Sequence, residues 1–231
     1  MFGRGSCRTD PANYRPISII PVLARVCEKI AAGQLYEYCD RRSVIPPEQC
    51  GFRRQSSCEM ALLYAIGEWI ASIDAGKMVG ALPIDLSKAF DCAPHQLLIR
   101  EVASSGCGMQ VQHWFTSYLD QRVQRVVQKG KVTEWRQVGR GVPQGSCLSP
   151  LLFNVFVRNL PSANQLATIQ FADDVTDYVA ESDPIVLAQK LTEGFNETKN
   201  FCEEHELKIN TGKTKLILFK HRTHSYRITL S

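Results

Sequence analysis

The chain has 231 residues, of which 44% are hydrophobic and 22% are charged, which is the composition of an ordinary globular protein. This balance excludes a largely disordered protein, and no apolar run is long enough to cross a membrane. The formal net charge is only +4, so the total charge alone does not indicate a nucleic-acid-binding protein.

The first half of the chain predicts two helices, a strand and a third helix. The first two helices span residues 22–38 and 57–73, the strand spans 78–85, and the third helix runs from Pro94 to about residue 104. The stretch "SSCE" offers a capping box at the start of the second helix. Apolar residues at helical spacing are expected to face the core: Leu23, Val26, Ile30 and Tyr38 in the first helix, and Leu62, Ile66, Trp69 and Ile73 in the second.

The second half of the chain predicts two hairpins and two more helices. Residues 122–138 predict a basic β-hairpin that turns at "KGK", and Ser149 and Pro150 start a helix through "LLFNVFVRNL". A strand, a tight turn and a second strand follow over 167–180, then a long helix from Asp183 to about residue 205 and a last strand, "TKLILF". The 167–180 hairpin favours an antiparallel α+β sheet.

Basic residues gather in three places along the chain. A solvated surface is the ordinary interpretation of any one cluster, but several clusters in one chain favour a polyanionic partner. The clusters are "DRRS" at 40–43, "FRRQ" at 52–55, and the stretch 121–140 with its four arginines and two lysines.

The nine cysteines include no CxxC pair, so we interpret them as reduced thiols and expect an intracellular protein without a disulfide framework. Cys92 and His95 have the spacing of metal ligands. Because no second half of such a site follows, we do not expect a metal there.

Two adjacent acids, Asp173 and Asp174, interrupt the apolar hairpin "TIQFADDVTDYVA" at its turn. Asp is a good turn residue, so a plain turn is one explanation. A second is that these carboxylates project from the end of the sheet beside Asp85, which ends the earlier strand. Hard divalent cations such as magnesium would relieve the repulsion between converging carboxylates. Two such ions about 4 Å apart can catalyse phosphoryl transfer.

Six stretches in the same order resemble the reverse transcriptase domain of non-LTR (LINE-like) retrotransposons. The resemblance covers nearly the whole chain, and "GVPQGSCLSPLLF" alone is hard to obtain by chance. The stretches are "NYRPISIIPVLARVCEKI" (13–30), "QCGFRRQSSCEMAL" (49–62), "PIDLSKAFDCAPHQLL" (83–98), "GVPQGSCLSPLLFNVFVRNLP" (141–161), "FADD" (171–174) and "LKINTGKTKLILF" (207–219).

The resemblance implies catalytic and substrate-binding roles for residues in the matching stretches. Asp85 and Asp173 would be the main ligands of two magnesium ions, with manganese as a possible substitute, and Asp174 would be a weaker third ligand. Phe90 would exclude a ribose 2′-hydroxyl, although a core aromatic is the alternative. Gln144 and Gly145 would lie under the nascent base pair, although a tight turn before a helix is the alternative.

The resemblance also implies roles for four basic residues, and for each of them an ordinary surface residue is the alternative. Arg15 would hold the triphosphate of the incoming nucleotide with its planar guanidinium. Arg53 and Arg54 would contact phosphates of the template. Lys213 would donate a proton to the departing pyrophosphate.

Several features depart from the family pattern. Pro83 lies two residues before Asp85 and indicates an edge strand or a slightly distorted one. "RNLP" at 158–161 replaces the usual acidic "DLP", and only Arg4 and Arg8 stand where a Lys is common before "NYRP". The resemblance also stops before the primer grip and the helical thumb, so we expect weak binding of a primer–template with steep salt dependence.

The fold class implied is α+β: the fingers and palm of a right-hand polymerase, with an antiparallel palm sheet packed on helices and the thumb absent. Fingers are expected at about 1–75 and 105–140, and the palm at about 76–104 and 141–231. The function implied is RNA-directed DNA polymerisation with an RNA template, a DNA primer and dNTPs, in a nuclear or cytoplasmic ribonucleoprotein without a membrane partner. A catalytically incompetent transposon fragment or a domesticated nucleic-acid-binding remnant is the alternative. A nucleotide cyclase is disfavoured, because "PQGS" would have no function in such an enzyme.

Overall fold

The structure is a computed structural model that describes residues 16–128, 130–161 and 165–221. Arg15 lies outside the described residues, as do Arg4 and Arg8. Within the described part of the chain, no helix is both long and apolar enough to cross a membrane.

The helices and strands follow the order expected from the sequence, with one substantial addition. The helix α5 lies in a stretch for which we predicted no helix, and α6 ends at Phe156, several residues before the end of "LLFNVFVRNL". The elements are α1 (Val22–Arg42), α2 (Cys58–Asp74), β1 (Met78–Asp85), α3 (Ala89–Cys92), α4 (His95–Ser104), α5 (Met109–Leu119), β2 (Val123–Gln124), β3 (Val127–Gln128), β4 (Lys131–Val132), β5 (Arg136–Gln137), α6 (Ser149–Phe156), β6 (Ala167–Phe171), β7 (Asp174–Glu181), α7 (Pro184–Glu204) and β8 (Ile217–Phe219).

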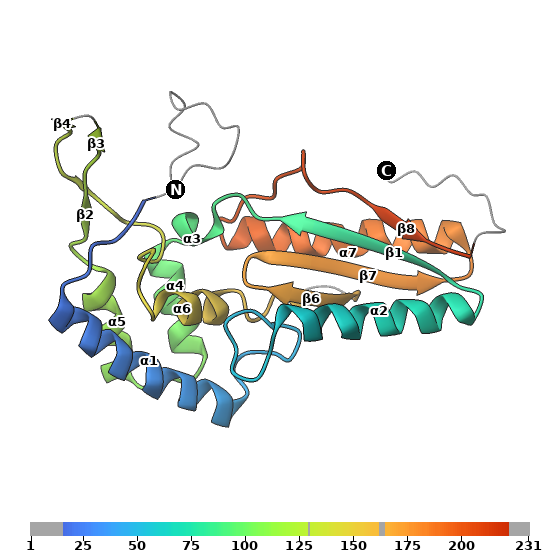
Figure 1. Cartoon of the computed structure of the whole chain (residues 1–231), viewed down its shortest axis with the longest axis horizontal. Helices are drawn as coiled ribbons and strands as arrows, with labels where there is room; N and C mark the ends of the chain where they lie inside the picture. The colour runs from blue at the N-terminus through green and yellow to red at the C-terminus, as the bar shows by residue number, and fades with distance from the viewer. Residues whose placement is uncertain (1–15, 129, 162–164, 222–231) are drawn as a thin grey trace.

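A four-stranded antiparallel sheet forms the centre of the molecule, with the strand order β6-β7-β1-β8 (Figure 1). The helix α7 covers one face, where Gly80 leaves room for the side chains of Leu187 and Leu191. The helix α2 packs on the opposite face, where the ring of Trp69 contacts Tyr178 and Phe219. The predicted antiparallel α+β architecture is therefore confirmed.

The strand β1 is an inner strand of this sheet, so of the two expectations for Pro83, an edge strand or a slightly distorted one, the edge strand was wrong. Residues 78–85 of β1 all pair with β7, including Pro83 with Thr176. On the other side, β8 pairs only with residues 79–81. Pro83 is tolerated because it lies beyond the end of β8, where the ladder on that side has stopped.

The start of α2 agrees with its sequence signal, but the buried faces of α1 and α2 do not. Ser57 is the N-cap of α2, and its hydroxyl accepts a hydrogen bond of 3.2 Å from the Met60 backbone N–H. The predicted stripes are exposed at Leu23, Val26, Ile30, Leu62 and Ile66. The buried positions are instead Glu28, Ala32, Leu35 and Cys39 in α1, and Ala61 and Ala65 in α2.

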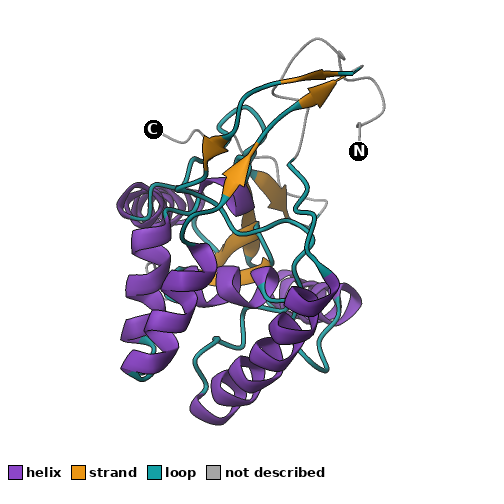
Figure 2. Ribbon diagram, turned by 90° about the vertical axis from the view of Figure 1, so that its left-hand side faces the viewer, coloured by secondary structure: helices purple, strands orange, loops and turns teal. Residues whose placement is uncertain are grey.

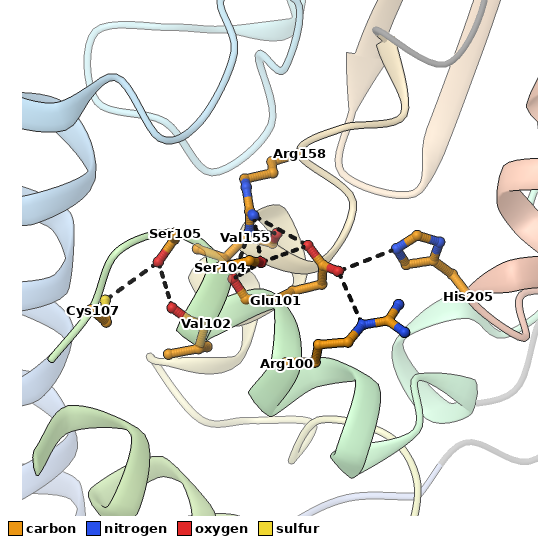
Figure 3. A network of polar contacts seen from close by, with 9 residues as sticks. All are labelled: Arg100, Glu101, Val102, Ser104, Ser105, Cys107, Val155, Arg158 and His205. Atoms are coloured by element: carbon orange, nitrogen blue, oxygen red, sulfur yellow. Dashed lines mark hydrogen bonds and ion pairs between the residues drawn. The ribbon is translucent and has the colours of Figure 1, made fainter. Parts of the chain in front are cut away.

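A buried ionic network joins the helices α4, α6 and α7 (Figure 3). The Glu101 carboxylate on α4 lies 3.2 Å from the Arg158 guanidinium, which follows α6, and 3.7 Å from His205 Nε2 at the end of α7. Arg158 also donates a hydrogen bond of 2.7 Å to the Glu101 backbone oxygen. The basic residue of "RNLP" therefore has a buried acidic partner in this chain.

The basic hairpin predicted over 122–138 is confirmed as two short antiparallel ladders, β2 with β5 and β3 with β4. It extends away from the rest of the molecule in both views (Figures 1 and 2). Its base is anchored because Arg122 Nη2 lies 3.3 Å from the Ser18 hydroxyl. On the arm itself, the Arg125 guanidinium lies 4.4 Å from the ring centroid of Trp135.

Candidate active site

The acids singled out in the sequence lie at one end of the central sheet. Asp85 ends β1 and Asp174 begins β7, and the two are direct cross-strand partners. Such partners project to the same face, with Cβ atoms about 4.5–5.5 Å apart. Asp173 lies in the turn of residues 172–173 that joins β6 to β7. The prediction that the two strands are neighbours is therefore confirmed.

The carboxylate of Asp85 has two polar neighbours from the segment before β8. Asn210 Nδ2 donates a hydrogen bond of 2.9 Å to Asp85 Oδ2, and the Asn210 backbone N–H donates one of 2.8 Å to the Asp85 backbone oxygen. Lys213 Nζ lies 3.4 Å from the same Oδ2 atom. The predicted proton donor Lys213 is thus beside a predicted metal ligand, and its side chain is exposed to solvent.

The side chains do not form a closed metal cage. Among the described residues, no group of three or more His, Cys, Asp and Glu side chains is close enough to hold an ion. The donor set nevertheless fits magnesium, because carboxylate oxygens are the ligands that this ion prefers. The convergence of Asp85, Asp173 and Asp174 on shared metal ions, and their roles, stay a prediction.

Phe90 lies in α3, the short helix that follows the end of β1, and packs against the core. Its half-buried ring stacks on Phe153 with a centroid distance of 4.3 Å and meets Phe52 edge-on at 6.2 Å. The ring therefore packs against one core aromatic, Phe153, as the alternative to a nucleotide gate requires, and against the exposed Phe52. Because it is only half-buried, it also keeps a solvent-facing part.

The "PQGS" loop is fixed by contacts with two other parts of the chain. Gln144 Nε2 donates a hydrogen bond of 2.6 Å to Asp91 Oδ1, and the Gln144 backbone oxygen accepts one of 2.9 Å from Ser18. Gly145 is exposed with a φ of 104°, a conformation that other residues rarely adopt. Val142, just before the loop, donates a backbone hydrogen bond of 2.8 Å to Phe90. The loop is thus tied to the segment that carries Phe90 and Asp91.

A buried hydroxyl network supports the same loop from the helical side. The Tyr118 hydroxyl of α5 donates to Glu28 of α1 at 2.8 Å and lies 2.8 Å from the Ser146 hydroxyl. Burial raises the pKa of Tyr118 above its usual 10.0, so the hydroxyl stays protonated. Glu28 is buried in this network although we expected apolar residues on the buried face of α1.

The arginines predicted to contact a template have protein partners. Arg53 Nη1 donates a hydrogen bond of 2.9 Å to the Pro46 backbone oxygen. The Arg54 guanidinium is exposed and lies 5.4 Å from the ring centroid of Tyr36. Arg53 therefore serves at least to hold its own loop, while Arg54 keeps a solvent-facing charge.

The thiols agree with the expectation of reduced cysteines, since all eight in the described part of the chain are free. Burial raises the pKa of the Cys39 thiol to about 12, so this thiol is unreactive. His95 Nε2 lies 2.9 Å from the Gly141 backbone oxygen, and Cys92 Sγ lies 3.7 Å from the Ser87 backbone oxygen. Burial lowers the pKa of His95, which favours the neutral ring in this contact.

Three polar residues near the site were missed when the sequence was interpreted. Asn210 holds Asp85, Asp91 holds Gln144, and Gln49 contacts the turn that carries Asp173. All three lie inside the quoted stretches that resemble the family. Their position was thus a signal, but sequence spacing could not reveal which polar atom each one contacts.

Comparison with known families and proteins gives a consistent result. The sequence model of a family described as "Reverse transcriptase (RNA-dependent DNA polymerase)" matches residues 6–228. The probable RNA-directed DNA polymerase from transposon BS of Drosophila melanogaster is 29% identical over 222 residues, which are 91% of this chain and 24% of that protein. The RNA-directed DNA polymerase from mobile element jockey of the same species is 25% identical over 229 residues, 96% of this chain and 25% of that protein. The chain thus spans about a quarter of the length of these relatives.

Solved structures show that the fold is the fingers and palm fold of polymerases. Apo telomerase from Candida tropicalis, truncated from its C-terminal domain, superimposes with a TM-score of 0.62 at 12% identity. The alignment covers 86% of this chain and 41% of that one. Telomerase from Candida albicans, solved with a TWJ fragment of telomeric RNA, gives a TM-score of 0.56 at 14% identity and covers 89% of this chain and 35% of that one.

Proposed function

The chain belongs to the reverse transcriptase (RNA-dependent DNA polymerase) family, and from this premise we propose that it extends a DNA primer on an RNA template with dNTPs as a non-LTR retrotransposon polymerase does. The observation that carries the proposal is the register of the central sheet. That register pairs Asp85 with Asp174 and puts Asp173 in the adjoining turn.

Asp85, Asp173 and Asp174 would hold two magnesium ions, and manganese would substitute for them. When bound, such ions activate the attacking primer 3′-hydroxyl and stabilise the charge on the leaving pyrophosphate. Asn210 orients the Asp85 carboxylate toward the site by its hydrogen bond to Oδ2. The contact of Lys213 with Asp85 supports its role as the proton donor to pyrophosphate, because it keeps an exposed ammonium beside the reacting phosphates.

The segments around the carboxylates would bind the substrates. Phe90 would restrict the sugar of the incoming nucleotide, and Gln144 and Gly145 would support the nascent base pair. The hydrogen bonds of Gln144 to Asp91 and Ser18 support this assignment, because they fix the loop before any substrate binds. Arg15 would bind the triphosphate.

Arg53 and Arg54 would bind phosphates of the template RNA. We assign residues of about 1–75 and 105–140 to the fingers, and about 76–104 and 141–231 to the palm. We further propose that the protein works in a nuclear or cytoplasmic ribonucleoprotein, which the names of its retrotransposon relatives support. A catalytically incompetent remnant is not favoured, because the family model matches nearly the whole chain.

A primer-extension assay tests the proposal. The chain is incubated with a DNA primer annealed to an RNA template, dNTPs and magnesium, and the products are separated on a denaturing gel. Extension that requires all four components supports the proposal. Tight RNA binding without extension, in magnesium or manganese, would refute it in favour of a nucleic-acid-binding remnant.

A further inference from the structure

Gln49 makes a set of hydrogen bonds that the proposed function does not yet use. It lies in the loop before α2, is completely buried, and forms a parallel bridge with Gln170 of β6. Its Oε1 atom accepts 2.9 Å hydrogen bonds from the backbone N–H groups of Gly51 and Ala172. Its Nε2 atom donates to the Ala172 backbone oxygen at 3.2 Å and to Gln170 Oε1 at 3.3 Å. One side chain therefore satisfies both backbone polar groups of Ala172.

Ala172 is the residue immediately before Asp173, and its backbone conformation is strained. Phe171 pairs with Asp174 across the hairpin, so residues 172 and 173 form a two-residue turn. Ala172 has a φ of 62°, which in such a turn normally favours glycine. A strained residue persists when its surroundings determine its conformation, and the two backbone contacts from Gln49 supply that constraint here.

The loop that carries Gln49 fits closely against the turn. A Cβ atom added to Gly51 would lie only 2.2 Å from the Ala172 backbone nitrogen, so only glycine allows this approach. The buried Asn154 of α6 donates a hydrogen bond of 2.8 Å to the Gly51 backbone oxygen and holds the loop from behind. Gln49 is therefore itself fixed in place, as a positioning group must be.

We propose that Gln49 is a positioning residue of the active site, which clamps Ala172 and thereby sets the direction in which the adjacent Asp173 and Asp174 project toward the metal ions. This inference rests on the proposed function. Residues that orient the ligands of a metal typically change its affinity by about 10- to 100-fold when they are replaced. Gln49 acts on the ligands through the backbone of the turn.

The decisive variant is Gln49→Glu, which keeps the shape of the side chain but, even when protonated, leaves only one donor for the two acceptors that Gln49 Nε2 serves, the Ala172 backbone oxygen and Gln170 Oε1. The matched control is Thr198→Val, which removes a buried hydrogen bond of 2.8 Å to Asp177 in the same sheet, away from the turn. Affinity for Mn²⁺ is measured by electron paramagnetic resonance on the full 231-residue chain without nucleic acid. The magnesium concentration at half-maximal primer extension and the melting temperature are measured alongside.

We expect Gln49→Glu to weaken Mn²⁺ binding and raise the magnesium requirement by about 10-fold or more, while Thr198→Val lowers the melting temperature without either change. If Gln49→Glu does not fold, Asn154→Ala tests the same clamp, and a smaller change in the same direction is expected. Equal metal affinities in the clamp and control variants, in a wild-type chain that binds Mn²⁺ and extends primers, would overturn the inference. A wild-type chain that neither binds Mn²⁺ nor extends primers would instead refute the proposed function.

Discussion

Replacing Phe90 by valine should have two separable effects, because the ring packs on the buried Phe153 and is also proposed to restrict the sugar of the incoming nucleotide. Truncating a fully buried Phe to Ala costs about 3–5 kcal/mol. Phe90 is half-buried and valine retains part of its contact, so packing accounts for about 1–2 kcal/mol. The aromatic pairs with Phe153 and Phe52 add about 1 kcal/mol. The expected total of about 2–3 kcal/mol corresponds to a decrease in melting temperature of roughly 5–10 °C.

Two assays separate these effects. Thermal unfolding followed by circular dichroism measures the loss of packing, and single-nucleotide insertion with dNTP or rNTP measures sugar selectivity. We expect Phe90→Val to raise the ratio of kcat/KM for ribonucleotides to that for deoxynucleotides. Phe156 is a matched control because its ring is fully buried in the same core, so Phe156→Val should destabilise the protein more without changing selectivity.

The packing role and the selectivity role of Phe90 can be refuted separately. An unchanged melting temperature for Phe90→Val would contradict the packing role inferred from the aromatic contacts. An unchanged ribonucleotide ratio, with the stability lost as expected, would show that Phe90 is a core residue and not a nucleotide gate.

Three further predictions follow from the polar contacts. Burial lowers the pKa of His95 below its usual 6.5, so the free energy of unfolding that neutral His95 contributes above that pH should be lost as pH falls through the folded-state pKa. Urea unfolding at a series of pH values should therefore show a free energy of unfolding that depends less on pH in His95→Gln than in the wild-type chain. Lys213→Ala should slow nucleotide addition about 100-fold or more in single-turnover assays, yet leave the melting temperature unchanged because the side chain is exposed. Arg158→Ala should leave Glu101 buried without its closest cation and cost about 3 kcal/mol in urea unfolding, and a cost below about 0.5 kcal/mol would refute the importance of this ion pair.

Periodicity and turn chemistry were sufficient to predict most of the fold. The hairpin of β6 and β7 was predictable because alternating apolar residues flank the adjacent acids Asp173 and Asp174, although the turn itself consists of residues 172–173. The helix α7 was predictable because Asp183 and Pro184 begin it. The helix α5 was not predicted within the stretch "GMQVQHWFTSYL", where Gln112 and His113 interrupt the apolar residues. Its burial rests on two residues, Phe115 and Leu119, which belong to the main core, and the helix packs against α4.

The buried faces of α1 and α2 could not be predicted from the sequence. Helical spacing identified Leu23, Val26 and Ile30, but these side chains are exposed, while Glu28 on the same helix is buried. A buried carboxylate requires a partner, and that partner is Tyr118, 90 residues away in the sequence. The choice of face therefore depends on a long-range contact that no local pattern contains.

The candidate site was predictable as a set of residues but not as a network. The position of acids at strand ends placed Asp85 beside Asp173 and Asp174, and the register agrees with this because it pairs Asp85 with Asp174. The contacts of Asn210 with Asp85, and of Gln49 with Ala172, join segments more than 100 residues apart. Such contacts depend on how loops pack against the sheet, so they could not be predicted from residue spacing alone.

The most direct test of the account is single-turnover addition of one dNTP to a DNA primer on an RNA template by the wild-type chain and by Asp85→Asn and Asp173→Asn. Wild-type addition that rises with magnesium concentration, together with loss of addition in both variants at unchanged melting temperature, is the predicted result. Addition at the wild-type rate by either folded variant would contradict the claim that the carboxylates at the end of β1 and in the β6–β7 turn hold the catalytic metal ions.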